Sequence, residues 1–417
     1  MKKTKAIIIS VSVLLICAVC FNMAGCASSI KADLMAGVKA NNVLPLKNLD
    51  SESVAITDFA VRIFKASAEK EENTLISPLS VLYALAMTAN GAKGETRAQM
   101  EAVLGMSVEE LNVYLYSYMD SLPQSEKSKL MLANSIWFAD YDRFTVNEDF
   151  LQTNADYYEA DIYKASFDRS TVRDINNWVK EKTDGMITDI LDDIPVDAIM
   201  YLVNALAFEA EWTDIYEKAQ VRDGIFTEAD GSREEVKLMY SNEGVYLEDE
   251  NAIGFIKYYK GRDYAFAALL PNENVSLEEY VASLDGESLN GILANAQYAT
   301  VNTAIPKFET EYDVEMSDIL KRMGMTDAFD GNAADFSGIG ASEAGNIYIS
   351  RVLHKTYISV GEKGTRAGAA TVVEMKDSGV AEITDPKQVY LDRPFLYMLI
   401  DCDTNIPFFI GTVNEID

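Results

Sequence analysis

The sequence contains a single histidine, His354, and this limits the acid–base chemistry that the chain could perform. A Ser–His–Asp hydrolase site would have to be built on it, because histidine is the general base of that site. None of the motifs G-x-S-x-G, H-E-x-x-H, G-x-G-x-x-G or the Walker loop is present. His354 lies in an alternating strand pattern near Val352, Tyr357 and Ile358, which favours a buried histidine and disfavours a hydrolase.

The composition is acidic, with 66 Asp and Glu residues against 36 Lys and Arg residues and a net charge of −30. This balance argues against nucleic-acid binding, which needs a basic surface. A hydrophobic content of 48% over 417 residues allows a large core. We find no internal repeat and no second domain, and the sequence predicts neither a metal nor a cofactor.

The N-terminus has the layout of a bacterial lipoprotein signal peptide over residues 1–25. Three lysines precede an apolar run over residues 6–21, and Met-Ala-Gly then precedes Cys26. This order resembles a lipobox, with Met23 in place of the usual leucine, and it predicts a lipidated Cys26 followed by a tether up to residue 50. An ordinary signal peptide or an uncleaved anchor helix stays open as an alternative.

Only Cys402 would remain in the folded domain, because Cys17 and Cys20 fall in the signal peptide. The sequence therefore predicts no disulfide. Cys402 follows an apolar run, so we expect a buried structural thiol.

The stretch 361–379, G-E-K-G-T-R-A-G-A-A-T-V-V-E-M-K-D-S-G, has features of both a strand and a loop. With a period of two, every charge between residues 364 and 376 falls on one face. A turn-like cluster follows at 377–379. A weakened strand before a surface loop and a loop that can insert into a sheet both fit this pattern. The uncharged face consists of Thr365, Ala367, Ala369, Thr371, Val373 and Met375.

The elements that must position these residues follow from apolar periodicity and from capping signals. We expect a Ser-Pro helix start after a short strand near residue 75, and residues 27–50 as a tether between the lipid and the domain. Further helices are predicted over 53–70, 174–193 (with a turn at 184–185) and 313–323. Strands are predicted over 133–138, 201–212, 265–271, 347–360 and, as a pair, 395–413.

Several of these segments resemble the serpins, the serine protease inhibitors. E-K-G-T-R-A-G-A-A-T at 362–371 resembles the serpin hinge, and 73–100, 174–193 and 201–212 resemble other serpin segments. The resemblance covers about residues 50–417. It implies an α+β fold with one large domain (51–417), a central mostly antiparallel sheet, two further sheets, about eight to nine helices and an exposed reactive loop at about 362–389.

The resemblance also implies suicide inhibition, in which a protease attacks the loop and the loop then inserts as a new strand of the sheet. Arg366 and Gly368 depart from the commoner residues, but both lie on the outward face. Glu209 and Ala210 replace the usual basic and glycine positions after Phe208. The hinge residues that the resemblance assigns are Glu362, Gly364, Thr365, Ala367, Ala369, Ala370 and Thr371.

The reactive bond is expected fourteen residues beyond Gly364, which gives Ser378–Gly379. Ser378 would suit a protease with a small specificity pocket, subtilisin- or elastase-like. The loop is a few residues longer than usual, so Lys376, Met375 and Val380 are alternatives, and Lys376 would suit a trypsin-like protease.

Carried over residue by residue, the serpin shutter falls on Ser77, Ser80, Asn204 and His354, and the breach tryptophan on Trp212. This cluster would control whether the central sheet can part.

These features predict a monomeric inhibitor of serine-type endopeptidases at the outer face of a bacterial membrane, or a secreted one, without a polyanion cofactor. A non-inhibitory serpin or a protease substrate is the alternative within the family. A solute-binding or structural lipoprotein is the alternative outside it, but such a protein has no need of a charge-free hinge face.

Overall fold

The computed structural model describes residues 28–68, 72–123, 128–140, 144–343, 345–365 and 385–416. The predicted signal peptide, Cys26, the loop residues 366–384 and the reactive bond within them lie outside the described residues.

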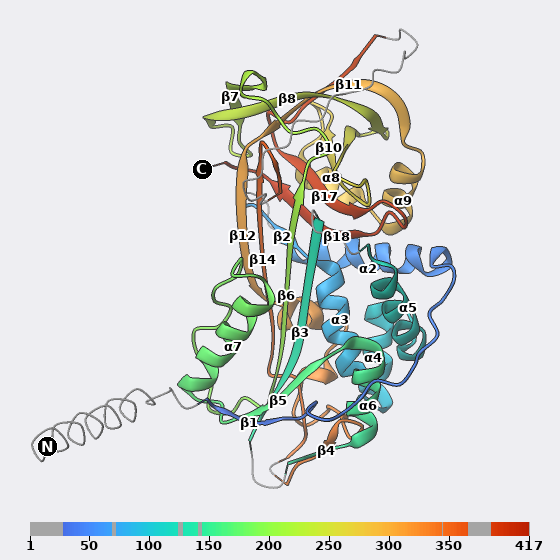
Figure 1. Cartoon of the computed structure of the whole chain (residues 1–417), viewed down its shortest axis with the longest axis vertical. Coiled ribbons are helices and arrows are strands. Elements are labelled where there is room, and N and C mark those ends of the chain that lie inside the picture. The colour runs from blue at the N-terminus through green and yellow to red at the C-terminus, as the bar shows by residue number, and fades with distance from the viewer. Residues whose placement is uncertain are drawn as a thin grey trace, which may run out of the picture.

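The described residues form one α+β domain with three sheets (Figure 1). The central sheet has seven strands, and its neighbouring strands are antiparallel except where β3 meets β5 and where β6 meets β14. In spatial order the strands are β1 (Ile30–Asp33), β5 (Asp161–Ala165), β3 (Ser128–Ala139), β6 (Met200–Glu211), β15 (Gly364–Thr365), β14 (Arg351–Gly361) and β12 (Phe308–Glu315).

A nine-stranded sheet packs on the central sheet, and a two-stranded sheet lies apart from both. In the nine-stranded sheet, every residue of β10 is buried, as its continuous apolar run predicts. The strands are β16 (Lys387–Tyr390), β11 (Gln297–Pro306), β8 (Arg233–Glu248) with β7 (Val221–Thr227) beside it, β9 (Ala252–Tyr258), β10 (Tyr264–Pro271), β17 (Phe395–Asp401), β18 (Pro407–Val413) and β2 (Leu75–Ile76); the small sheet joins β13 (Gly340–Ala341) to β4 (Thr145–Val146).

Nine α-helices occur within the described ranges, and none of them is long and apolar enough to cross a membrane. Figure 1 shows α7 on one side of the long central strands and α3 to α6 on the other. The helices are α2 (Asp50–Ser67), α3 (Pro78–Ala89), α4 (Gly94–Leu104), α5 (Val108–Ser121), α6 (Glu148–Tyr158), α7 (Arg169–Lys182), α8 (Leu277–Ser283), α9 (Gly286–Ala294) and α10 (Ser317–Met323).

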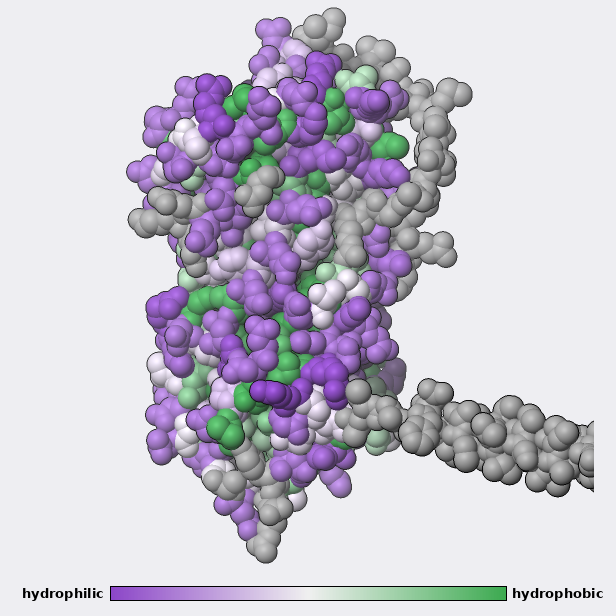
Figure 2. All heavy atoms as spheres, turned by 90° about the vertical axis from the view of Figure 1, so that its left-hand side faces the viewer, coloured by the Kyte–Doolittle hydropathy of each residue, from purple (hydrophilic) through white to green (hydrophobic). Residues whose placement is uncertain are grey.

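Strand β6 is buried on both faces because two separate apolar clusters cover it. Leu206 and Phe208 belong to the main core between the sheets, whereas Val203 and Ala205 belong to a smaller cluster beneath α7. Side chains alternate along a strand, so even-numbered residues of β6 face the core and odd-numbered ones face α7. Figure 2 shows the side of the molecule that carries α7 and β12, where the hydrophilic surface is interrupted by hydrophobic patches.

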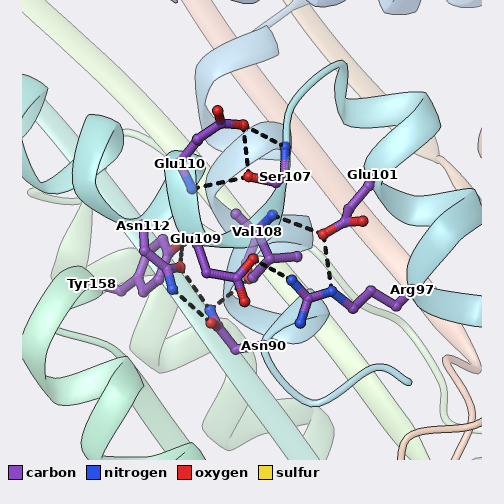
Figure 3. Close-up of polar contacts among 10 residues, drawn as sticks. Asn90, Arg97, Glu101, Ser107, Val108, Glu109, Glu110, Asn112 and Tyr158 are labelled. Carbon is purple, nitrogen blue, oxygen red and sulfur yellow. Dashed lines mark hydrogen bonds and ion pairs between the residues drawn. The ribbon is translucent and has the colours of Figure 1, made fainter. Parts of the chain in front are cut away.

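A polar network fixes the helices on the other side of the sheet (Figure 3). Ser107 caps α5 in a capping box with Glu110. The amides of Asn90 and Asn112 bond each other reciprocally at 2.9 and 2.8 Å, joining α5 to the end of α3. The Tyr158 hydroxyl on α6 donates to Asn112 at 2.5 Å, so this network holds the base of α3 in place.

Residues 28–49, the described part of the predicted tether, lie against the domain and include a strand of its central sheet. β1 pairs with β5 at the edge of the central sheet. The Asp174 carboxylate on α7 accepts from the Ser29 backbone at 2.6 Å and from its hydroxyl at 2.7 Å. The edge strand of a sheet offers unpaired backbone N–H and C=O groups, and pairing with them does not depend on side-chain pattern. Apolar periodicity therefore did not predict β1.

Two helix boundaries also differ from the sequence prediction. The helix expected over 174–193 ends at Lys182, and the predicted turn follows with Asp184 and Gly185 at positive φ. The helix expected from residue 313 begins only at Ser317, because β12 extends to Glu315 by pairing with β14. Long-range strand pairing overrides local helical spacing there.

Candidate functional site at the seam of the central sheet

The centre of the seven-stranded sheet contains a seam between two parallel strands. β6 and β14 pair directly over six positions, from Tyr201 with Arg351 to Leu206 with Thr356. Beyond these pairs the two strands no longer pair with each other, and β15 lies between them. The two strands therefore pair directly at one end of the seam and are separated by the two-residue strand β15 at the other.

β15 continues from β14 through a tight hairpin whose turn residues are Glu362 and Lys363. Thr365 pairs with Val360 on β14 and with Ala210 on β6, both antiparallel. The predicted hinge residues Gly364 and Thr365 thus occupy two positions of a central strand. The remaining hinge residues from Ala367 onward lie outside the described residues.

Gly364 is the residue that permits this close approach. Its φ is +153°, and a Cβ atom there would lie 1.9 Å from the carbonyl oxygen of Ala210. Only glycine accommodates both the conformation and the contact.

Thr365 is fully buried, and its hydroxyl bonds the hydroxyl of Tyr259. The Trp212 ring stacks on Tyr259 with a centroid distance of 4.4 Å. The backbone N–H of Trp212 donates to the carbonyl oxygen of Lys363 at 2.8 Å, and its indole N–H donates to that of Gly361 at 2.9 Å. The predicted breach residue Trp212 therefore holds both the hairpin turn and the ring beneath Thr365.

Two ion pairs surround this turn. Lys307 lies 3.0 Å from the Glu362 carboxylate. Burial raises the pKa of Glu362, but its own backbone N–H and Lys307 outweigh burial and leave that pKa below its usual range. Beside Trp212, the buried Lys257 lies 2.8 Å from Glu243, and its ammonium group is 4.5 Å from the ring centroid of Tyr216.

The four residues predicted as the shutter lie together at the closed end of the seam. The backbone N–H of Ser77 donates to His354 Nε2 at 3.1 Å, so Nε2 carries no proton. Nδ1 is then the protonated nitrogen, and it donates to Asn204 Oδ1 at 2.6 Å. The Ser80 hydroxyl donates to the same oxygen at 2.9 Å. Burial lowers the pKa of His354 to about 3, so the ring is neutral at physiological pH.

The start of helix α3 positions two members of this cluster, Ser77 and Ser80. Ser77 is its N-cap and accepts from the backbone N–H of Ser80, and Pro78 occupies the first helical position. The sequence S-P-L-S therefore fixes both serines beneath the seam.

His354 and Asn204 are also direct register partners across the seam. Adjacent strands lie about 4.8 Å apart, so a strand inserted at this level would double the separation of β6 from β14 and break their side-chain bond. His354 is fully buried, as the strand pattern predicts, and its Nε2 already accepts a backbone hydrogen bond.

Cys402 is partly buried and, among the described residues, free of disulfide bonding. Burial raises the pKa of its thiol to about 12, which keeps it protonated. No cluster of potential metal ligands occurs within the described ranges.

The central sheet thus holds the short strand β15 between β6 and β14, and a buried polar cluster of Ser77, Ser80, Asn204 and His354 lies where β6 and β14 pair directly. The chain belongs to the serpin family: the model of Serpin (serine protease inhibitor) matches residues 54–416.

Relatives and solved structures agree with this assignment. The human leukocyte elastase inhibitor is 30% identical, over 87% of this chain and 99% of that protein. An uncharacterised serpin-like protein of Thermococcus kodakarensis is also 30% identical, over 86% and 84%. The crystal structure of the thermophilic serpin tengpin in the native state is 51% identical and has a TM-score of 0.88 over 92% of this chain and 99% of that chain. Tengpin in the latent state gives 0.79 at 50% identity, covering 91% and 100%.

Sequence reasoning missed Tyr259 and Lys307, the partners of Thr365 and Glu362. Neither residue belongs to a sequence motif, and each comes close to residues 362–365 only once the sheets have formed. The family pattern found Trp212, His354, Asn204 and the two serines, but the hydrogen bonds among them required the structure.

Proposed function

We propose that this protein is a suicide inhibitor of serine-type endopeptidases that traps its target by inserting its own loop into the central sheet. The observation that carries the proposal is the position of Gly364 and Thr365, which form the two-residue strand β15 between β6 and β14. A loop that begins at β15 would insert by extending this strand along the same seam.

In the proposed reaction, the protease serine hydroxyl attacks the carbonyl carbon of Ser378. The bond to Gly379 breaks, the leaving amine takes up the proton of the serine, and Ser378 remains as an ester on the protease. Residues 366–378 then insert as a strand of thirteen residues, which carries the ester about 43 Å at about 3.3 Å per residue. Displacement on that scale distorts the protease before water releases the ester.

The target class follows from the proposed reactive bond. Ser378 has a small side chain, which suits a protease with a small specificity pocket, and the leukocyte elastase inhibitors are among the similar proteins. We propose elastase- or subtilisin-like proteases as targets, with Lys376 as the reactive residue if a trypsin-like enzyme is trapped instead.

The test is a denaturing gel of residues 27–417 after brief exposure to subtilisin, elastase and trypsin. We expect a band at the summed mass that survives boiling, and mass spectrometry of the released C-terminal peptide identifies the reactive bond. Thr365→Arg should abolish this band, because a charge there would be buried unpaired beside Tyr259, whereas Thr365→Ser keeps the hydroxyl and should retain the band. Clean cleavage without an adduct from any of the three proteases would instead indicate a non-inhibitory serpin or a substrate.

We also propose that Cys26 is lipidated after removal of residues 1–25, which would anchor the inhibitor at the cell surface. The support is the lipobox-like order Met-Ala-Gly-Cys. Expression of the full chain in a bacterium with radiolabelled palmitate should label the wild type and not Cys26→Ser. An unlabelled wild type would leave secretion as the localisation.

A further inference from the structure

The segment that follows β6, residues 212–216, binds the turn between β14 and β15. Three N–H groups of this segment donate to the three carbonyl oxygens of the turn. The hydrogen bonds run from the Trp212 backbone to Lys363 at 2.8 Å, from the Trp212 indole to Gly361 at 2.9 Å and from the Tyr216 backbone to Glu362 at 2.9 Å. Residues 212–216, here called the turn clamp, therefore fix the position of the turn.

A buried lysine on β9, Lys257, lies against the turn clamp. Its side chain is only 1% exposed. Its ammonium group lies 5.4 Å from the ring centroid of Trp212 and 4.5 Å from that of Tyr216. The same group donates to the carbonyl oxygen of Asp214 at 3.3 Å. One ammonium group thus contacts the first, third and fifth residues of the turn clamp.

Glu243 on β8 supplies the counter-charge of this lysine. The Glu243 carboxylate lies 2.8 Å from the Lys257 ammonium group, and the Glu243 side chain is 11% exposed. The same carboxylate oxygen accepts from the Ser241 hydroxyl at 2.6 Å. The Ser241 hydroxyl in turn lies 3.2 Å from the hydroxyl of Tyr216. Glu243 is therefore linked to the turn clamp both through Lys257 and through Ser241.

A buried ammonium group is stable in a protein only when its charge and its hydrogen bonds are satisfied. Lys257 meets this condition with the Glu243 carboxylate, the Asp214 carbonyl oxygen and the faces of two aromatic rings. Loss of Lys257 would leave the Glu243 carboxylate nearly buried without its cation, which is strongly destabilising. Because three of the lost contacts are with the turn clamp, the effect should be concentrated there.

The ion pair of the turn itself lies at the surface. Lys307 pairs with Glu362 at 3.0 Å, but the two side chains are 41% and 40% exposed. An exposed ion pair contributes little to stability, because water and salt screen it. The buried pair of Lys257 with Glu243 therefore has more influence on the position of the turn than this surface pair.

We infer that Lys257, paired with Glu243, is a positioning residue that holds the turn 361–363, and with it β15, in the central sheet. β15 has only two residues, so its place in the sheet depends on the turn that precedes it. A second part of the inference rests on the proposed function: loss of Lys257 lowers the share of the inhibitor that traps a protease, because β15 is then held less firmly between β6 and β14.

Hydrogen–deuterium exchange of the whole protein tests the first part without any protease. The backbone N–H groups of Trp212 and Tyr216 exchange only when their hydrogen bonds to the turn open. Mass spectrometry of a peptide that covers the turn clamp gives this rate, and a peptide that covers β10 gives the rate of the core. Lys257→Met removes the charge and keeps a long unbranched side chain, whereas Lys257→Arg keeps a cation that can stack on aromatic rings.

We expect Lys257→Met to speed exchange in the turn clamp about tenfold or more and to change exchange in β10 by less than about twofold. Lys257→Arg should stay within about threefold of the wild type at the turn clamp. Glu243→Gln keeps a hydrogen-bond acceptor without the charge and should speed exchange there about fivefold. It tests the same pair if Lys257→Met does not fold.

Two matched variants control for the loss of a lysine. Lys164 on β5 has an ion pair of the same length, 2.8 Å to Asp140, and lies 5.7 Å from the ring centroid of Phe144. Lys164→Met should therefore leave exchange in the turn clamp unchanged. Lys307→Met removes the surface pair of the turn and should change this exchange by less than about twofold.

Unchanged exchange in the turn clamp of both Glu243→Gln and a folded Lys257→Met would overturn the inference. Equally faster exchange in β10 would also overturn it, because the pair would then stabilise the whole domain and not the turn. The same effect from Lys164→Met would do so as well.

Protease trapping is measured separately on a denaturing gel with subtilisin and elastase. Lys257→Met should lower the ratio of covalent adduct to cleaved inhibitor about fivefold, and an unchanged ratio together with faster exchange would overturn the second part of the inference. If the wild type forms no adduct but exchange in the turn clamp responds as expected, the positioning role of Lys257 is supported and only the proposed function is refuted.

Discussion

Replacement of His354 by glutamine should make the free energy of unfolding less dependent on pH below pH 6.5. His354 is the only histidine of the chain, and burial lowers its pKa from 6.5 to about 3. Glutamine offers an amide of similar polarity that stays neutral throughout this range. The variant therefore removes one titrating group and leaves all carboxylates in place.

The direction and size of the effect follow from proton linkage. Between pH 6.5 and about 3 the unfolded chain binds a proton at His354 and the folded chain does not, so acid favours unfolding. The contribution of the neutral His354 to the free energy of unfolding is fully present above pH 6.5 and is lost as the pH falls. Each pH unit corresponds to about 1.4 kcal/mol, so the wild type should lose about 2 kcal/mol more than His354→Gln between pH 6.5 and pH 5.

The assay is urea unfolding of both proteins at intervals from pH 8 to pH 4, with the free energy taken from the first transition. A folded variant at pH 8, verified by its near-UV circular dichroism, is the control for structural damage. Parallel pH curves for the two proteins would refute the reasoning, because they would mean that His354 takes up its proton equally in the folded and unfolded chains.

Three further predictions concern single residues. Gly364→Ala should displace β15, because the added Cβ would lie 1.9 Å from the Ala210 carbonyl oxygen. We expect the free energy of unfolding in urea to fall by about 1–3 kcal/mol, and a gel to show cleaved inhibitor in place of the covalent adduct. An unchanged ratio of cleaved inhibitor to adduct would contradict this. Cys402, whose thiol has its pKa raised to about 12, should resist iodoacetamide at pH 8 until the protein is unfolded, and equal labelling of both states would refute its burial. Asp174→Ala removes the carboxylate that accepts two hydrogen bonds from Ser29, next to β1. Trypsin should then cleave β1 at Lys31 about tenfold faster, as measured by mass spectrometry. An unchanged cleavage rate would mean that β1 is held by its backbone pairs alone.

The sequence predicted the parts of the fold that depend on local pattern. The run over 265–271 is buried throughout, as a continuous apolar run requires, and the Ser-Pro start of α3 lies where capping chemistry places it. The two strands expected over 395–413 are also present. These features follow from neighbours in the sequence.

Features that depend on distant partners were not predictable in this way. Residues 313–315 have helical spacing, yet they form strand because β14 supplies partners about forty residues later, including the ion pair of Asp313 with Lys355 at 3.7 Å. Tyr259 reaches Thr365 across 106 positions. The family motif pointed to residues 362–371, but it carried no information on what Glu362 and Thr365 contact.

The pairing of β6 with β14 also bears on how the chain folds. The two strands are about 150 residues apart, so their union requires closure of a very long loop, whereas the hairpin of β14 with β15 closes over two residues. Hairpins form in about 1–10 μs, and long-range sheet pairing is far slower. During synthesis and refolding, the hairpin of β14 with β15 is therefore expected to form before β6 pairs with β14. Conditions that slow the long-range pairing of β6 with β14 should therefore lower the yield of folded protein.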